Sequence, residues 1–244
     1  GDIIYSNNLN LKIFDKKKEI KIYQNHPNDW ILFSNMNLKN WKIEFIGKKI
    51  NDKDHSFQRM NFFGMTGCIN FFNIKAQNIY FDIHDGYCED SLNIVNSFGN
   101  IKSLNILSSY ADALDIDFSI IDIDKINVKN AGNDCIDLSS GKYKILYATL
   151  NNCSDKAISV GEKSTLDLKT LKINKAKTGI ASKDSSLSEV DEAIIENIEL
   201  CLSAYNKKQE FFGGQIKVKN IKCRNFTKKI NTDDVSKIIM SNLQ

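Results

Sequence analysis

The sequence predicts an all-β protein, a parallel β-helix built from about seven or more coils that repeat every 22 positions. Small residues recur at this spacing, the next position is always aliphatic, and apolar and polar residues alternate around both. The small column holds Ser91, Ala113, Cys135, Ala157, Gly179 and Cys201, and the aliphatic column holds Leu92, Leu114, Ile136, Ile158, Ile180 and Leu202. A fixed period of this length is typical of stacked repeats that bury their apolar faces on one another.

The alternation identifies the repeating element as a strand. In the segment 112–117, Leu114 and Ile116 point one way while Asp115 and Asp117 point the other. Side chains alternate with a period of two in a strand and of 3.6 in a helix. A leucine-rich repeat has a similar length, but its signature is missing from these repeats.

A second strand and a turn complete each predicted coil. The second strand is marked by pairs of apolar residues: Leu104/Ile106, Ile126/Val128, Ala148/Leu150, Leu171/Ile173, Ala193/Ile195 and Ile216/Val218. The turn after it carries Ser108, Asn130, Asn152, Lys175, Asn197 and Asn220. Stacked asparagines hydrogen-bond along such columns and tolerate left-handed backbone, so we expect a structural role for them.

The chain of 244 residues is expected to form one elongated domain. Regular coils are predicted over 65–223. Residues 1–64 contain strand-like pieces at 9–14, 19–23 and 41–45 that fall out of phase, and they are expected to form irregular early coils and a cap. Residues 224–244 are expected to include a short amphipathic cap, because uncovered strand edges invite association.

Composition excludes several functional classes. The net charge is +3 from 33 basic and 30 acidic residues, and the lysines are scattered, which disfavours nucleic-acid binding. No apolar run reaches the length of a membrane span, and no signal peptide is visible, although the chain opens without methionine and is interpreted as an excised piece. The nucleotide-binding, serine-hydrolase and zinc-protease motifs are missing.

The six cysteines do not form Cys-x-x-Cys pairs, which disfavours zinc. Compact buried thiols are the expected interpretation, because Cys135 and Cys201 lie in the small-residue column. The only disulfide that the sequence leaves as an option joins Cys201 and Cys223. These two residues are one repeat apart and would lie at similar positions on adjacent coils.

The outward face of the first strand is the candidate site. One outward column reads Asn93, Asp115, Asp137, Ser159, Ala181 and Ser203, and the column two residues on reads Val95, Asp117, Ser139, Gly161, Lys183 and Tyr205. Asp115, Asp117 and Asp137 would share one patch, with neighbouring Cα atoms about 4.8 Å apart across the strands. Carboxylates this close require a cation or a retained proton. Both a Ca²⁺ site and merely solvated carboxylates stay open for them. Asp90, Asp112 and Asp134, at the leading edge of the strand, are expected to fix turns.

Basic and aromatic residues lie further along the same face, where we expect Tyr205, Lys163 and Lys207 to bind substrate, with Lys208 beside them. Lys183 and His84 are candidate bases that remove a proton next to a substrate carboxylate. A solvated lysine surface and an incidental histidine are the alternatives for these residues.

Four stacked segments carry a family resemblance: DALDIDFS at 112–119, GNDCIDLSS at 132–140, DKAISVGEKS at 155–164 and GIASKDS at 179–185. They resemble the right-handed parallel β-helix, or pectin-lyase-like, superfamily over about residues 65–223. That resemblance implies a right-handed helix and a polysaccharide substrate that is acidic. The segment Asp82-Ile-His-Asp85 is similar to the Asp-Pro-His-Asp motif of mannuronan C5-epimerases but lacks the proline. The polygalacturonase pattern lacks its histidine here.

Three functions remain open from the sequence. The leading hypothesis is a lyase or C5-epimerase acting on a uronate-containing glycan, with Asp115, Asp117 and Asp137 holding a cation such as Ca²⁺ or polarising the substrate carboxylate. The alternative is a non-catalytic glycan-binding or structural module of a larger cell-surface or envelope protein. A glycoside hydrolase is the third. All three stay open because fold alone does not decide function, and an extracytoplasmic or cell-surface location accompanies each of them.

Overall fold

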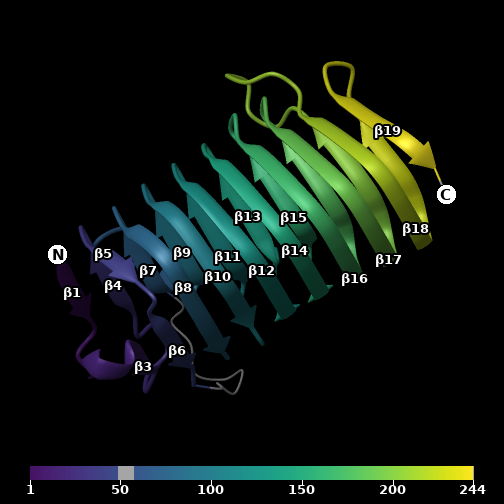
Figure 1. Cartoon of the computed structure of the whole chain (residues 1–244). Coiled ribbons are helices and arrows are strands. Elements are labelled where there is room, and N and C mark those ends of the chain that lie inside the picture. Colours follow the sequence, from purple (N-terminus) through teal and green to yellow (C-terminus); the bar gives the residue numbers. More distant parts are fainter. Residues whose placement is uncertain (49–57, 244) are drawn as a thin grey trace.

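The computed structural model describes residues 1–48 and 58–243, and it is a parallel β-solenoid of about 10 turns (Figure 1). The strands stack side by side from the N-terminal to the C-terminal end of the molecule. The predicted fold class is therefore confirmed.

Each coil contributes a short strand to a first ladder and a longer, bent strand to a second ladder. The first ladder consists of β4 (Ile31–Ser34), β7 (Gly67–Phe72), β9 (Asp90–Val95), β11 (Asp112–Asp117), β13 (Ile136–Ser139) and β15 (Lys156–Gly161). The second consists of β5 (Asn37–Lys39), β6 (Lys42–Ile46), β8 (Lys75–His84), β10 (Phe98–Ile106), β12 (Ile120–Ala131) and β14 (Lys142–Cys153). Towards the C-terminus both parts of a coil merge into β16 (Thr165–Lys183), β17 (Leu187–Tyr205) and β18 (Gln215–Thr232), followed by β19 (Lys237–Leu243).

The register confirms the predicted period through β17. Leu92 pairs with Leu114, Leu114 with Ile136, Ile136 with Ile158, and the column continues through Ile180 to Leu202. These aliphatic side chains belong to one continuous buried core. The residue after each core residue, such as Asp115 or Asp137, points outward, as the alternating pattern predicts, whereas the small residue before it, such as Ala113 or Cys135, is also buried.

The N-terminal segment closes one end of the solenoid. β1 (Asp2–Tyr5) pairs antiparallel with β4, and β2 (Asn10–Phe14) pairs antiparallel with β3 (Glu19–Tyr23), with a short 3₁₀ turn, η1 (Asp15–Lys17), between β2 and β3. Behind this cap, β3 stacks in parallel on β6, and Ile31 of β4 pairs with Ile69, so this coil is much longer than the later ones. The longer coil explains why the N-terminal strands fall out of phase with the repeat.

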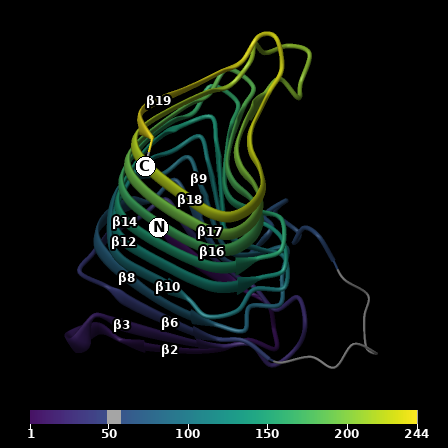
Figure 2. The same ribbon diagram turned by 90° about the vertical axis from the view of Figure 1, so that its right-hand side faces the viewer.

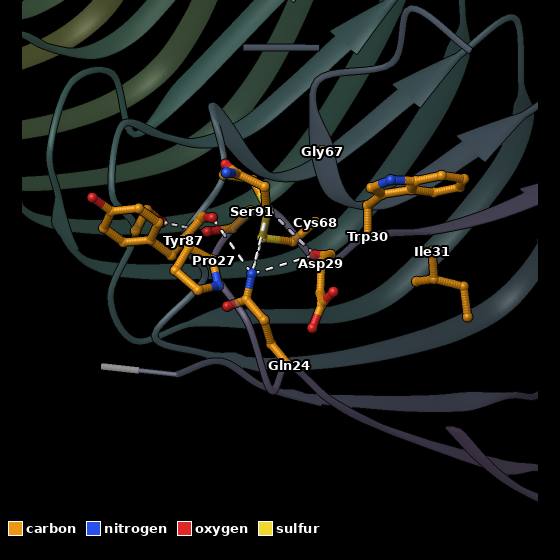
Figure 3. Close-up of a disulfide and its surroundings, with 12 residues drawn as sticks. Gln24, Pro27, Asp29, Trp30, Ile31, Gly67, Cys68, Tyr87 and Ser91 are labelled. Carbon is orange, nitrogen blue, oxygen red and sulfur yellow. Dashed lines mark hydrogen bonds between the residues drawn. A yellow bond between two sulfur atoms is a disulfide. The ribbon is translucent and has the colours of Figure 1, made fainter. Parts of the chain in front are cut away.

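The Cys68–Cys88 disulfide joins the first regular coil to the turn before β9 (Figure 3). The buried Gln24 side chain lies against it, and its Nε2 donates to the carbonyl oxygens of Asp29 at 3.3 Å and Tyr87 at 3.4 Å. The cap is thus connected to the coils by a buried amide as well as by strand pairing.

A longer loop at 206–214 changes the period near the C-terminal end. Ala193 pairs with Ile221 and Ile195 with Cys223, a longer step than in the preceding coils. The prediction that Ile216 and Val218 continue the second-strand column is therefore wrong; they pair with Ser188 and Val190. The asparagine column is corrected likewise, because Asn225, not Asn220, donates to Asn197 Oδ1 at 3.1 Å. Further down the column, Asn152 donates to Asn130 as predicted.

The predicted short amphipathic cap at the C-terminus is also wrong. Residues 237–243 form β19, which continues the stack in parallel on β18. Ile238 and Met240 alternate along the strand and pack against the core. In so short a segment, the spacing of apolar residues does not distinguish a strand from an amphipathic turn. No helix within the described residues is long and apolar enough to cross a membrane.

All six cysteines are paired, in the disulfides Cys68–Cys88, Cys135–Cys153 and Cys201–Cys223. The expectation of free buried thiols is therefore wrong, and only the pairing of Cys201 with Cys223 was foreseen as an option. The small-residue column meets the end of the second strand at a sharp corner. The Ser91 hydroxyl bonds Ser109 Oγ there at 2.9 Å, and Cys135 meets Cys153 in the equivalent place two coils on. Disulfides persist in oxidising compartments, which indicates an extracytoplasmic setting.

Candidate functional site: an acidic cluster on the first ladder

A polar column runs along the outward face of the first ladder. Asn70 pairs with Asn93, Asn93 with Asp115, Asp115 with Asp137, and Asp137 with Ser159. Outward residues of a solenoid are normally exposed, yet Asn93 is 2% and Ser159 0% exposed. This face is therefore sheltered by its surroundings. Figure 2 views the stack nearly end-on and shows that the coil narrows above a wider base.

Asp115, Asp117 and Asp137 form what we call the acidic cluster. Asp115 and Asp137 are direct neighbours on β11 and β13, and Asp117 lies two residues beyond Asp115 on the same face. The predicted juxtaposition is therefore present in the structure. Asp115 Oδ2 accepts a hydrogen bond from Asn93 Nδ2 at 3.1 Å, and Asp137 Oδ1 is a buried oxygen with no hydrogen-bond partner among the described residues.

Two of the three leading-edge aspartates, Asp112 and Asp134, organise the turn before the first strand. Asp112 Oδ1 accepts the backbone N–H of Asp134 at 2.7 Å, and Asp134 Oδ1 accepts the backbone N–H of Lys156 at 2.8 Å. These two carboxylates thus fix the chain of the next coil, as expected. Asp90 pairs in register with Asp112, and its Oδ2 is buried with no hydrogen-bond partner in the described part of the chain.

Burial and mutual repulsion raise the pKa of these carboxyl groups. Burial raises the pKa of Asp112 to about 6 and that of Asp134 to about 7, although Lys156 opposes the second shift. Burial, with repulsion from Asp137 and Glu162, raises the pKa of Asp117 to about 6. The pKa of Asp115 lies well above its ordinary value because of burial and then of neighbouring aspartates. These carboxyl groups therefore titrate closer to neutral pH than ordinary aspartates do.

Lys183 is the basic residue that the structure brings to the acidic cluster. It is 7% exposed, and its Nζ donates to Ser159 Oγ at 2.7 Å and lies 4.0 Å from Asp137 Oδ1. The glycine one coil earlier in the same column leaves room for this side chain, because a Cβ at Gly161 would lie 2.8 Å from Cε of Lys183. The lysine therefore compensates the charge of Asp137 from beneath the surface.

The predicted substrate-binding residues gather at the turn above the acidic cluster. Tyr205 pairs with Lys183 in register, and Lys163 Nζ lies 5.7 Å from the ring centre of Phe211. The 206–214 loop is held by the buried Asp184, whose Oδ1 accepts the backbone N–H groups of Lys207 and Lys208 at 2.7 and 2.8 Å. The Lys208 ammonium in turn pairs with Glu162, which repels Asp117.

A hollow of about 470 Å³ lies at this turn, beside the acidic cluster. Phe118 and Phe211 line it, together with Lys142, Glu162 and Lys163. Phe118 follows Asp117 directly in the chain and is largely exposed. The hollow thus continues the charged face with aromatic and basic side chains.

His84 lies on a different ladder. It ends β8, pairs in register with Ile46, and its Nε2 lies 3.2 Å from Asp82 Oδ1. The structure therefore does not bring this candidate base to the acidic cluster. The Asp82–Asp85 segment, which resembles an epimerase motif, lies with it.

Several residues of the site escaped the sequence prediction. Ser159 was recognised only as a column member, and its bond to Lys183 was not foreseen; Phe211 and Asp184 were missed because the 206–214 loop breaks the period. Lys156 also lies at the site, 3.6 Å from Asp134 Oδ1. Lys156 comes one repeat after Asp134 in the sequence, and this spacing could have predicted that the two side chains lie close together.

Ca²⁺ is one of the two options that the sequence leaves open for the three carboxylates. Within residues 1–48 and 58–243 no three His, Cys, Asp or Glu side chains converge into a group that could hold a metal ion. Ca²⁺ takes six to eight oxygen ligands, whereas Asp115 Oδ2 is bonded to Asn93 and Lys183 lies next to Asp137. The side chains alone therefore do not fit a resident Ca²⁺ ion.

In comparisons with protein-family models, curated proteins and solved structures, no match to this chain was found. The site must therefore be interpreted from its own chemistry.

Proposed function

We propose that this chain acts on an acidic, uronate-containing polysaccharide at the acidic cluster, as a lyase or C5-epimerase. The observation that carries the proposal is the pair of neighbouring, sheltered carboxyl groups of Asp115 and Asp137, of which the first has a pKa well above its ordinary value and the second lies next to a lysine. Clustered carboxyls with raised pKa values lower stability at neutral pH, and such arrangements concentrate at functional sites. The resemblance of residues 112–185 to polysaccharide-active β-helices supports the substrate class.

An acid-rich face repels a polyanion unless its carboxyls carry protons or share a cation. The raised pKa of Asp115 favours its protonated form, and Asp117, with a pKa of about 6, would take up a proton as the uronate binds. A neutral carboxylic acid then donates a hydrogen bond to the uronate carboxylate. That hydrogen bond withdraws charge from the uronate and so makes its C5 proton more acidic. We include Ca²⁺ only as an ion that the bound glycan would share with Asp117 and Asp137.

Different residues of the acidic cluster would remove and donate the protons. Asp137 takes the C5 proton, and Lys183 compensates its charge. In a lyase, the C4–O bond then breaks, a C4–C5 double bond forms, and the leaving oxygen receives a proton from Asp117. In an epimerase, no bond to C4 breaks, and a solvent water molecule returns a proton to C5 from the opposite face of the ring. Lys183 is nearly buried, so we assign it a positioning role rather than that of the base.

A panel of acidic polysaccharides tests the proposal. Eliminative cleavage is followed by the absorbance of the unsaturated uronate, and epimerisation by exchange of the C5 proton with deuterium from solvent, each with and without chelator. We expect Asp115→Asn and Asp137→Asn to abolish the signal, while Asp122→Asn, an exposed aspartate on the second ladder, retains it. Full activity in both cluster variants would overturn the site.

The second candidate is a glycan-binding or structural module of a larger cell-surface protein. Its support is that none of the three carboxylates lines the hollows of about 620, 510 and 470 Å³. Glycan binding that persists in the cluster variants, without any turnover, would favour this function. Release of reducing ends without unsaturated product would instead favour the third candidate, a hydrolase.

A further inference from the structure

Phe118 has a backbone conformation that large apolar residues rarely adopt. Its φ is 50°, in the left-handed region, and glycines aside it is the one apolar residue with a positive φ in residues 1–48 and 58–243. The residue directly after the first-ladder part of each coil has this conformation, and that column reads Asn35, Asn73, Asn96, Phe118, Ser140, Glu162 and Asp184. Asparagine and aspartate tolerate left-handed backbone, whereas a bulky residue there is an outlier.

The stacking of the coils imposes this conformation on Phe118. Its backbone N–H donates to Ser139 O at 3.1 Å, just as the N–H of Asn96 donates to Asp117 O at 3.1 Å one coil earlier. The next residue, Ser119, is buried, and its Oγ donates to Asp117 O at 2.6 Å. The Phe118 side chain itself is 64% exposed. The ring therefore strains the turn without packing into the core.

The surroundings of the ring indicate a ligand site. Phe118 and Phe211 line the hollow of about 470 Å³, a volume within the range of small-ligand sites. Most of the other lining residues are polar or charged, among them Ser140, Glu162 and Thr165. Because the centre of a protein–protein interface is depleted in charged residues, this lining favours a polar ligand with an apolar face over a docked protein.

The uncompensated charge of the hollow is positive. Lys142 and Lys163, which line it, are exposed, and neither forms an ion pair within residues 1–48 and 58–243. Glu162 also lines the hollow, but it is paired with Lys208. The C–H face of a sugar ring packs on an aromatic side chain as other apolar groups do, and ammonium groups bind a carboxylate through charge-assisted hydrogen bonds. The hollow therefore fits a sugar that carries a carboxylate.

We propose that the hollow binds a second uronate unit of the glycan, directly next to the unit at the acidic cluster. Its ring would pack on Phe118, and its carboxylate would pair with Lys142 and Lys163. Phe118 follows Asp117 in the chain, and consecutive Cα atoms lie only about 3.8 Å apart, so the two bound units are neighbours. The inference rests on the function proposed for the acidic cluster, and it names the substrate class: glycans in which uronates follow one another directly.

Two kinds of oligosaccharide test the preference for consecutive uronates. The probes are homopolymeric uronate oligosaccharides and hyaluronan oligosaccharides of equal length, in which each uronate alternates with an uncharged sugar. In calorimetric titration we expect the homopolymer to bind at least tenfold more tightly. Lys142→Gln/Lys163→Gln should remove most of this preference, whereas Lys125→Gln, at an exposed lysine of the second ladder, should retain it.

The Phe118→Asn variant separates a binding role from a structural one. We expect it to bind the homopolymer at least fivefold more weakly and yet to unfold at a higher temperature, because asparagine fits the left-handed turn. Tyr147→Asn, at an exposed tyrosine of the second ladder, should leave the affinity unchanged. The reverse substitution Asn96→Phe, at the equivalent turn one coil earlier, should lower the unfolding midpoint.

Equal binding of the two kinds of oligosaccharide, or no binding of the homopolymer at millimolar concentration, would overturn the proposal. Unchanged affinity in Phe118→Asn would overturn it too, as would a lower unfolding midpoint, which would show that the ring supports the fold. Turnover with an unchanged KM in Phe118→Asn would leave the function of the acidic cluster intact while this inference fails. Homopolymer binding that depends on Phe118, without turnover of any acidic polysaccharide, would support the hollow as a uronate site while the proposed activity fails.

Discussion

The Lys183 ammonium lies 4.0 Å from Asp137 Oδ1 while it donates to Ser159 Oγ, so one buried lysine serves two neighbouring coils of the outward column. Its removal leaves Asp137 without a compensating charge. We expect Lys183→Met to lower the free energy of unfolding by about 1–3 kcal/mol, less than the loss for a fully buried pair because Asp137 is partly exposed. Urea denaturation measures this.

Lys172→Met is the matched control for that substitution, because Lys172 is exposed on the same strand. Its effect should stay within about 0.5 kcal/mol. In the Asp137→Asn background, Lys183→Met should cost less than in the native chain. Additive losses would show that the two side chains do not interact.

Stability should fall as the pH rises from about 4 to about 7. The carboxyl groups of Asp112, Asp117 and Asp134 have folded-state pKa values of about 6, 6 and 7, above the ordinary value of 3.8. The folded chain therefore binds more protons than the unfolded chain in this window, and the linkage contributes stability below pH 4 that is lost as these groups ionise. Thermal unfolding at pH 5 and pH 8 should show the higher midpoint at pH 5.

Asp115→Asn should raise the unfolding midpoint at pH 8, because it removes a buried carboxyl group that neighbouring aspartates repel. Each kcal/mol gained corresponds to about 2–4 °C in a chain of this size. The raised pKa of Asp115 favours the protonated carboxyl at lower pH, so the gain should be smaller at pH 5. A loss of stability at pH 8 would contradict the raised pKa of Asp115.

The first ladder shows which parts of the structure can be predicted from the sequence. Its period and alternation placed Asp115 beside Asp137 correctly, because parallel stacking converts a fixed spacing into lateral contact. The same 22-residue period placed Ile216 and Asn220 in the wrong columns, because the 206–214 loop lengthens one coil. The disulfide between Cys135 and Cys153 could not be deduced either, since their 18-residue spacing becomes a contact only at a corner whose sharpness depends on the backbone.

Replacement of both Cys135 and Cys153 by alanine should cost about 3 kcal/mol, the loss expected for a disulfide that closes a loop of this length. The preceding coil has Ala113 and Ala131 in the equivalent positions, so two alanines fit the corner without strain. The double variant should therefore still fold, with the loss seen in chemical denaturation. Failure to fold would mean that the corner depends on the covalent bond.

Phe211→Ala should weaken glycan binding several-fold, because it removes one aromatic wall of the hollow and the ring next to Lys163. Phe212→Ala is its control, since Phe212 is adjacent in sequence and more exposed but does not line the hollow. Calorimetric titration with the glycan that gives activity compares the two. Equal effects of both variants would show that the hollow is not part of the binding surface.

Proton uptake on glycan binding tests the central claim most directly. Calorimetry in buffers of different ionisation enthalpy measures the number of protons taken up at pH 7. The account predicts net uptake that disappears in the Asp117→Asn variant, because Asp117, with a pKa of about 6, is mostly ionised at pH 7 and must be protonated opposite a uronate. Binding without proton uptake, unchanged in that variant, would contradict the assignment of the acidic cluster as the glycan site.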